Sequence, residues 1–181
     1  MSPTDPPTAT LKDASPARLF LALWPTPALD ARLGGYRRQC LWPKSAIPVR
    51  TDRLHLTLHF IGAVDHWRLG EVAAGLRVEV EPFELILRRA AIWPNGVAVL
   101  QTAETPAALH RLHARLGDAL RALDLPVEKR TFRPHLTLAR RALGATLPSV
   151  TPPLRWPVAD YRLVASTLGA GGGYRLVKRY A

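Results

Sequence analysis

The stretch His55-Leu56-Thr57-Leu58 occurs a second time in this 181-residue chain, as His135-Leu136-Thr137-Leu138. Polar and apolar residues alternate in both copies, which predicts two β-strands, over 54–61 and 132–140. Because side chains alternate between the two faces of a strand, each histidine shares a face with its threonine, about 7 Å away, while the leucines face a core. Each copy therefore predicts a half-buried strand that presents an imidazole and a hydroxyl together.

The same order of elements precedes both copies. A strand is predicted over 19–24 before the first copy and over 97–102 before the second. Each is followed by a Thr-Pro helix start, Thr26-Pro27 and Thr105-Pro106, in which the threonine caps the helix and proline occupies its first position. The helices extend to about Cys40 and Leu123. This order indicates an internal duplication.

Further elements complete the predicted order. They are a helix over 65–79 and strands over 83–92, 158–167 and 174–180. The Asn-Gly of the turn 93–96 predicts a hairpin between two of the strands. The glycine-rich stretch 169–173 lacks the Gly-Lys-Ser/Thr of a phosphate loop and is interpreted as a hairpin loop.

Composition places the chain among ordinary globular proteins, with 48% hydrophobic and 22% charged residues. We expect residues 1–17, rich in Pro, Thr, Ser and Ala, to form a disordered tail, and 18–181 to form a single domain. No apolar run approaches the roughly 20 residues that span a bilayer. The single cysteine, Cys40, excludes a disulfide framework and a multi-cysteine zinc site. A cytoplasmic location is the expectation, as is a monomer.

Positive charge predominates: Lys plus Arg number 25 against 14 Asp plus Glu, a formal net charge of +11. The excess is concentrated after residue 128, where ten basic residues accompany one acidic residue. Two interpretations stay open. Either the excess serves a polyanionic partner such as nucleic acid, or the enrichment in Ala, Arg, Leu and Pro reflects genomic base composition.

Two histidines at one site suit acid–base transfer at phosphorus. If a pseudo-two-fold axis relates the halves, the two His-x-Thr pairs face each other across one cleft. Attacking and leaving oxygens lie roughly in line at a phosphate, so each histidine can serve one of them. With an ordinary pKa of about 6.5, one imidazole can act as a base while the other donates a proton. Thr57, Thr137 and Arg140 can hold the non-bridging oxygens, and this chemistry requires no metal.

The sequence resembles the 2H phosphoesterases, and among them the RNA 2′,3′-cyclic phosphodiesterases, also called 2′-5′ RNA ligases. The resemblance is carried by both motif copies, by the segments 18–22 and 60–62, by Phe132-Arg133-Pro134 before the second copy, and by Ser166 with Tyr174-Arg175-Leu176. It extends over nearly the whole chain beyond the tail.

That resemblance implies an α+β, bilobal, duplicated fold, with two antiparallel sheets lining a central cleft and helices outside. It implies hydrolysis of RNA 2′,3′-cyclic phosphate ends, including those of tRNA fragments or cyclic nucleotides, to 2′-phosphates without a cofactor. The same site run backwards would form a 2′-5′ linkage.

Residue roles also follow from the resemblance. His55 would be the general acid that protonates the departing 3′ oxygen, and His135 the general base that activates water. Thr57, Thr137 and Arg140 would bind the phosphate. Phe20, Arg133 and Tyr174 are further candidates for substrate contact.

Alternative functions stay open at this point. One is an RNA-binding module without catalysis. Another is a phosphodiesterase acting on ADP-ribose cyclic phosphate or 2′-5′ oligoadenylates. A third is a metallohydrolase that uses His55 and His59, which share a face if the strand is regular. A packing role is the preferred interpretation of His59, a solvated helix face that of His110 and His113, and a structural role that of Cys40.

Overall fold

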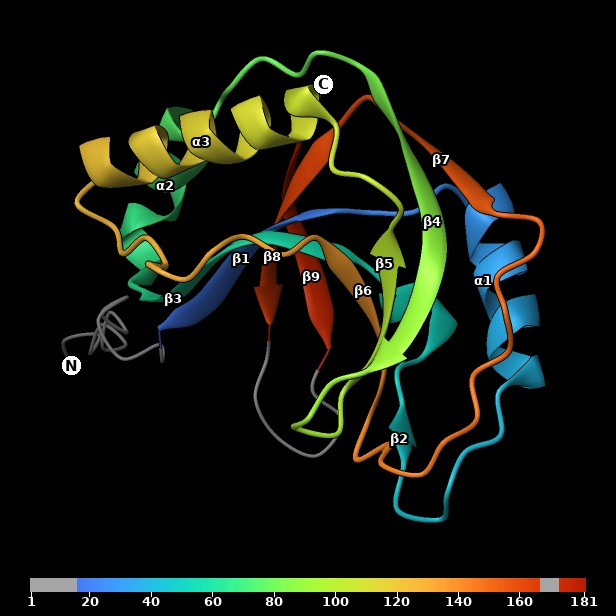
Figure 1. Cartoon of the computed structure of the whole chain (residues 1–181). Helices are drawn as coiled ribbons and strands as arrows, with labels where there is room; N and C mark the ends of the chain where they lie inside the picture. The colour runs from blue at the N-terminus through green and yellow to red at the C-terminus, as the bar shows by residue number, and fades with distance from the viewer. Residues whose placement is uncertain (1–15, 167–172) are drawn as a thin grey trace, which may run out of the picture.

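The computed structural model describes residues 16–166 and 173–181. It is an α+β fold, as expected, with three α-helices and nine strands in the described residues (Figure 1). The helices are α1 (Pro27–Gln39), α2 (Leu69–Gly75) and α3 (Ala107–Ala122). The strands are β1 (Ala17–Leu23), β2 (Ile47–Pro48), β3 (Leu56–Val64), β4 (Phe83–Ile92), β5 (Ala98–Thr102), β6 (His135–Arg140), β7 (Leu154–Val158), β8 (Tyr161–Ser166) and β9 (Tyr174–Tyr180).

The described strands form one sheet in the order β7-β4-β5-β6-β3-β1-β8-β9, with β2 paired to β6. The prediction of two separate sheets was therefore wrong. The halves are joined where the two motif strands pair with each other, through the antiparallel register Leu56↔Leu136. This joint is narrow, since no other β3–β6 pair is present, and both leucines are fully buried. Direct pairing of the repeated strands merges two half-sheets into one curled surface.

A leucine-rich core covers one face of the sheet. Leu56, Leu58, Leu136 and Leu138 pack in it together with the buried sides of α1 and α3. Helix α1 lies at one side of the sheet near β7, and α2 and α3 lie together at the other (Figure 1). A smaller cluster of Phe20, Ala22, Val164 and the half-buried Trp24 is separate from this core. The sheet therefore has a helix-covered face and a second face with its own apolar patch.

The Thr-Pro signal predicts the start of α1 correctly but not that of α3. Thr26 caps α1 as predicted, since its Oγ1 accepts a hydrogen bond from the backbone N–H of Leu29 at 3.3 Å. Thr105 does not repeat this role. Helix α3 begins one residue later, with Pro106 as its N-cap residue and no side-chain cap. The carbonyl of Pro106 accepts the N–H groups of Leu109 and His110 instead.

Several predicted bounds need correction. The helix expected over 65–79 is a 3-10 turn, His66–Arg68, followed by the short α2. The second motif strand begins at His135 rather than 132, and β2 and β7 were missed. The pattern of β7, Leu-Arg-Trp-Pro-Val, contains a proline, which argues against a strand in sequence reasoning but is tolerated here because β7 is an edge strand.

Turn chemistry positions the hairpin between β4 and β5. The N–H of Gly96 donates to the carbonyl of Trp93 at 2.8 Å, and Gly96 adopts a φ of +76°, as the Asn-Gly signal predicted. Residues 1–15 of the predicted tail and 169–172 of the glycine loop lie outside the described residues. Ala17, at the end of the predicted tail, is already the first residue of β1.

Candidate active site

The two motif strands are neighbours in the sheet. The pair Leu56↔Leu136 joins them, with His55 and Thr57 on either side of Leu56 and His135 and Thr137 on either side of Leu136. We call the surface that carries these four side chains the histidine face. The pairs were expected on opposite walls of a cleft. They lie on neighbouring strands of one curled sheet, close enough for the positive charge of His135 to act on His55.

Each histidine is held by the same backbone contact. The Nδ1 of His55 lies 2.7 Å from the carbonyl oxygen of Arg53, and the Nδ1 of His135 lies 2.6 Å from that of Arg133. A carbonyl only accepts hydrogen bonds, so Nδ1 carries the proton in both rings. The free Nε2 is then the atom that accepts a proton when the ring is neutral and donates one when it is charged.

The electrostatics lower both histidine pKa values. Burial lowers the pKa of His55 most, the hydrogen bond to Arg53 opposes this, and the positive charges of His135 and Arg140 lower it further. Burial also lowers the pKa of His135, with the Arg133 carbonyl opposing and the Arg133 guanidinium adding to the shift. The two motif copies and Arg140 therefore act on one another, and a proton on one histidine disfavours a proton on the other.

The surroundings of the two rings differ. His55 is enclosed by three aromatic rings: it stacks on Trp24 at 5.2 Å between centroids, lies 5.0 Å from Phe20 and meets the edge of Tyr174 at 5.3 Å. Among the described residues, Trp93 is the ring that contacts His135, at 4.5 Å. The face beside His55 is aromatic, whereas the face beside His135 is more polar.

Arginines flank these rings. The guanidinium carbons of Arg53, Arg133 and Arg162 lie 5.4 to 5.8 Å from the ring centroids of Tyr174, Trp93 and Trp24, respectively. Interleaved cations and aromatic faces are typical of surfaces that bind single-stranded nucleic acid.

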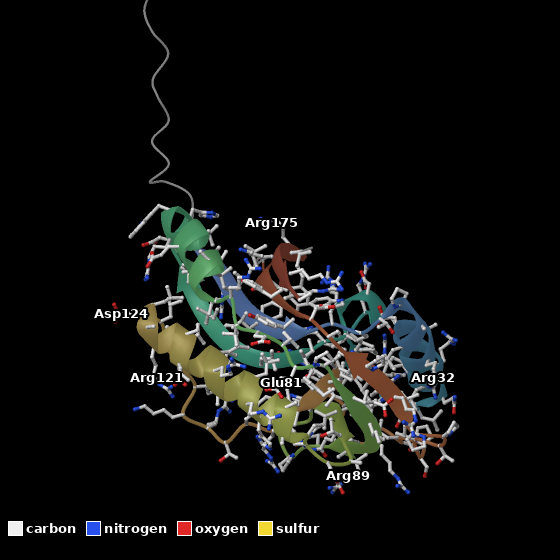
Figure 2. The ribbon with its side chains drawn as sticks, turned by 90° about the horizontal axis from the view of Figure 1, so that it is seen from above. Arg32, Glu81, Arg89, Arg121, Asp124 and Arg175 are labelled. Carbon is white, nitrogen blue, oxygen red and sulfur yellow. The ribbon has the colours of Figure 1, made fainter. Side chains whose placement is uncertain are left out.

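Positive charge is nevertheless spread over the whole molecule. The labelled side chains of Arg32, Arg89, Arg121 and Arg175 lie on different sides of it (Figure 2). Acidic partners neutralise others, such as Arg111, which binds Glu81 at 2.7 Å. Net charge alone therefore does not define the site; the arginines beside the histidines do.

A β-bulge recurs at the fourth residue of each motif. On β3, Ala22 and Leu21 pair with Thr57 and His59, so Leu58 is an extra residue. On β6, Val99 and Ala98 pair with Thr137 and Ala139, so Leu138 is the extra one. Bulges next to functional sites change which face the following side chains occupy.

This bulge places His59 in the core rather than beside His55. His59 is 3% exposed, stacks on His113 at 4.0 Å and donates from Nε2 to the carbonyl of His113 at 2.8 Å. The shared face assumed for His55 and His59 was wrong because the strand is irregular, and the packing role preferred for His59 is confirmed. His113 is half-buried and stacks on Phe132, so its predicted solvated face was also wrong.

The bulge also brings two residues to the histidine face: Phe60, which is 46% exposed, and Arg140. Arg140 was predicted from the sequence, as were Phe20, Arg133 and Tyr174, and all four lie at this face. Trp24, Trp93, Arg53 and Phe60 were missed. The sequence signal for Trp24 was its position directly after a buried strand, one residue past the pair Leu23↔Leu56, which puts it beside His55.

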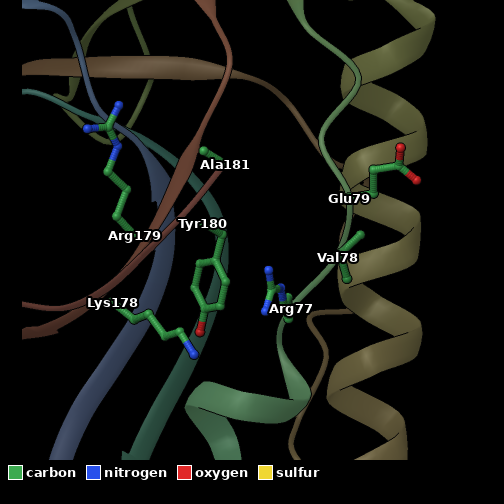
Figure 3. Close-up of a pocket in the computed structure, with 7 residues that line it drawn as sticks. All are labelled: Arg77, Val78, Glu79, Lys178, Arg179, Tyr180 and Ala181. Atoms are coloured by element: carbon green, nitrogen blue, oxygen red, sulfur yellow. The ribbon is translucent and has the colours of Figure 1, made fainter.

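A pocket of about 510 Å³ lies elsewhere in the molecule. Figure 3 shows its lining, which comes from the segment 77–79 after α2 and from the end of β9 with Ala181, and it contains none of the histidines. Within residues 16–166 and 173–181, no group of three or more His, Cys, Asp and Glu side chains comes together. None of the helices in these ranges is long and apolar enough to cross a membrane. Cys40 is buried, in accordance with a structural role.

Comparison with known proteins places this geometry in a family. A profile of the 2′-5′ RNA ligase superfamily matches residues 25–168, a range that contains both motifs. The chain belongs to this superfamily. It is 31% identical to the RNA 2′,3′-cyclic phosphodiesterase of Escherichia coli over 93% of this chain and 98% of that protein. It is 33% identical to the Thermus thermophilus enzyme of the same name, over 74% of each chain.

Solved structures of the superfamily share the fold. The apo form of E. coli LigT superposes with a TM-score of 0.83 at 29% identity, covering 92% of this chain and 98% of that one. The complex of LigT with 3′-AMP superposes with a TM-score of 0.82, covering 91% and 97%. Superfamily members at this distance are thus enzymes named for cyclic phosphate chemistry, and one of them binds a nucleoside 3′-phosphate.

Proposed function

We propose that this protein hydrolyses RNA 2′,3′-cyclic phosphate ends to 2′-phosphomonoesters by two-histidine acid–base catalysis. The observation that carries the proposal is the repeated motif in one patch: two imidazoles with the same anchored Nδ1 and free Nε2, two threonines, and Arg140. The names of the relatives supply the substrate class.

Each group has a defined task in this mechanism. Neutral His135 accepts a proton from water at Nε2 as the water oxygen attacks phosphorus. Protonated His55 donates its Nε2 proton to the 3′ oxygen as the P–O3′ bond breaks. Thr57, Thr137 and Arg140 donate hydrogen bonds to the non-bridging oxygens, whose charge must be stabilised. The five-membered cyclic diester holds its reacting atoms in place, which reduces what the protein must position.

Substrate binding supplies the required protonation state. Burial lowers the pKa values of both histidines. A bound phosphate anion raises them, because an opposite charge within about 4–6 Å favours the imidazolium. Binding of the anion therefore favours uptake of the proton that the acid will donate, and proton transfer through these groups requires no metal.

The test is a product-resolved assay with adenosine 2′,3′-cyclic phosphate and a cyclic-ended oligonucleotide, with and without EDTA. The expected product is the 2′-phosphate at an unchanged rate in EDTA. A 3′-phosphate product would contradict the assigned geometry, and loss of activity in EDTA would contradict the mechanism. Binding of the oligonucleotide without turnover would favour the RNA-binding module, and joining to a 5′-hydroxyl end would reveal the reverse ligation.

A further inference from the structure

A row of polar side chains extends from His135 across the sheet, away from the strand that carries His55. Gln101 on β5 pairs directly with His135, and Arg89 on β4 pairs directly with Gln101. Directly paired residues of antiparallel strands share a face, so all three belong to the histidine face. Neighbouring strands lie about 4.8 Å apart, which sets the Cα atoms of Arg89 and His135 roughly 10 Å apart. An arginine therefore lies two strands beyond the proposed general base.

A β-bulge determines which arginine takes this position. On β4, Leu87 and Arg89 pair with Thr102 and Gln101, so Arg88 is an extra residue. In a regular strand, Arg88 would stand opposite Gln101. Bulges are over-represented beside active sites, where they redirect a side chain. The irregular backbone of β4 thus sets Arg89, rather than its neighbour, at the end of the polar row.

The guanidinium of Arg89 has no acidic partner in the described residues. It is exposed, and within residues 16–166 and 173–181 it makes no hydrogen bond or ion pair. The one acidic residue of β4, Glu84, binds Arg155 of the edge strand β7 instead. The half-buried carboxamide of Gln101 makes no side-chain hydrogen bond in the same ranges. The row therefore offers a free cation and a free amide beside His135.

Hydrolysis with water as nucleophile makes no use of this row. Attacking and leaving oxygens lie roughly in line at phosphorus. In the proposed reaction the ribose stays on the O3′ side, beside His55, and the attacking oxygen lies on the opposite side, beside His135. Water carries nothing beyond its oxygen that would reach β4. A nucleotide that attacks through its 5′-hydroxyl extends over that side and carries its own 3′-phosphate further along.

We propose that Arg89 and Gln101 bind the phosphate of an RNA strand that occupies the attacking side with its 5′-hydroxyl end. This inference rests on the proposed function and names a second substrate strand for the same site. The phosphate in question follows the first nucleotide of that strand. Arginine makes a charge-assisted, bidentate contact with a phosphate, and the glutamine amide adds a hydrogen bond.

The step at this site is a phosphoryl transfer between two oxygens. His135 accepts the 5′-hydroxyl proton at Nε2 as O5′ bonds to phosphorus, the P–O3′ bond breaks, and O3′ takes the proton of His55. The product contains a 2′-5′ junction. Cleavage of the junction is the reverse step, in which O3′ attacks and O5′ leaves with a proton from His135. In dilute solution cleavage is favoured, because one molecule becomes two, so cleavage is the direction to measure.

The experiment uses short RNAs with a single 2′-5′ junction. In one RNA the phosphate after the first nucleotide beyond the junction is an ordinary diester, and in the other it is an uncharged methylphosphonate. Arg89→Ala is expected to lower kcat/KM for the diester RNA by roughly 10-fold, and to reduce the slope of log(kcat/KM) against log[salt] by about 0.7 to 1. On the methylphosphonate RNA, Arg89→Ala and wild type are expected to be equal. Arg89→Lys keeps the charge and part of the activity.

Two comparisons separate the subsite from folding and from net charge. With adenosine 2′,3′-cyclic phosphate, where water takes the attacking side, Arg89→Ala is expected to match wild type, which also shows that the variant is folded. The matched control is Arg38→Ala, which removes an exposed guanidinium from α1 and leaves all three substrates unaffected. Gln101→Leu is expected to lower kcat/KM for the diester RNA by a smaller factor than Arg89→Ala.

The inference is overturned if Arg89→Ala cleaves the diester RNA as well as wild type does, or loses activity equally on both junction RNAs. It is also overturned if wild type hydrolyses the cyclic phosphate but cleaves neither junction RNA, and the proposed function then stands alone. If wild type acts on none of the three substrates, the proposed function fails. Calorimetric binding of a 5′-hydroxyl dinucleotide then decides: weaker binding by Arg89→Ala supports the subsite, and equal binding overturns it.

Discussion

The two halves of the sheet carry the same motif with the same bulge, and they differ in the side chains that surround each histidine. The recurrent bulge brings Phe60 to the histidine face in one half and Arg140 to the equivalent position in the other. Beside the histidines, Trp24 stacks on His55, whereas Gln101 pairs with His135. The internal duplication inferred from the sequence would account for two imidazoles at one site. The more aromatic surroundings of His55 and the more polar surroundings of His135 would give the pair the direction of reaction that we propose.

The largest expected effect comes from removing either histidine. His55→Ala and His135→Ala are each expected to lower kcat on the cyclic phosphate by about 10²- to 10⁴-fold, because each removes one proton transfer. A substrate with sulfur at the bridging 3′ position separates the roles. Thiolate leaves without protonation, so this substrate restores activity to His55→Ala and leaves His135→Ala inactive. Rescue of His135→Ala instead would reverse the acid and base assignments.

The second prediction concerns Arg140, on the half of the sheet that carries His135. Arg140→Ala is expected to lower kcat by about 10²-fold, the usual cost of losing one donor that stabilises transition-state charge. The effect falls on substrates with and without a base alike, because Arg140 is expected to contact the phosphate. Arg141→Ala, which removes the adjacent exposed guanidinium, is the control in steady-state kinetics. Equal losses in the two arginine variants would indicate only a general electrostatic effect.

The halves also differ in the core, where the residue after the bulge is His59 on β3 and Ala139 on β6. This difference is expected to affect the stability of the protein in acid. Burial, with the charges of His59 and His110, lowers the pKa of the stacked His113 to about 4. In the unfolded chain the same histidine has its ordinary pKa near 6.5, so as the pH falls the unfolded state takes up a proton before the folded state does. The contribution of neutral, buried His113 to the free energy of unfolding is therefore fully present above pH 6.5. It declines by up to about 3 kcal/mol as the pH falls to about 4.

Urea unfolding at pH 7 and pH 4.5 measures this loss. His113→Gln is expected to reduce the difference in unfolding free energy between the two pH values. An unchanged difference would assign the acid sensitivity to other groups. His59 and the two motif histidines, whose pKa values are also lowered, are the remaining contributors.

The smallest effect concerns the pH optimum. Because the pKa values of His55 and His135 are both lowered in the free enzyme, the singly protonated pair is most populated below pH 6.5. The optimum of kcat/KM is therefore expected below pH 6.5, and that of kcat at a higher pH, since the bound phosphate anion raises both values. If kcat/KM and kcat have the same pH optimum, the bound substrate does not raise the pKa values of His55 and His135.

Sequence reasoning predicted the elements whose signals are local. The alternation of both motifs, the Thr26 cap of α1 and the Asn-Gly turn each depend on neighbouring residues, and all are present. Two helix ends were predicted wrongly. Pro106 rather than Thr105 is the N-cap of α3. Helix α2 ends at Gly75, and the Tyr161 hydroxyl bonds the backbone of Leu76 and Val78 beyond it. The edge strand β7 was missed because its proline is acceptable only in a position that the sheet order defines.

The sequence by itself determined the features from which we predict acid–base chemistry on a phosphate: two His-x-Thr copies, a nearby arginine and a repeated order of elements. Only the tertiary structure decided that the two copies are paired neighbours, that a bulge sends His59 inward and Phe60 outward, and which half is aromatic. The reason is physical. Alternation along a strand is a local property, whereas register, bulges and contacts between strands depend on partners far away in the chain.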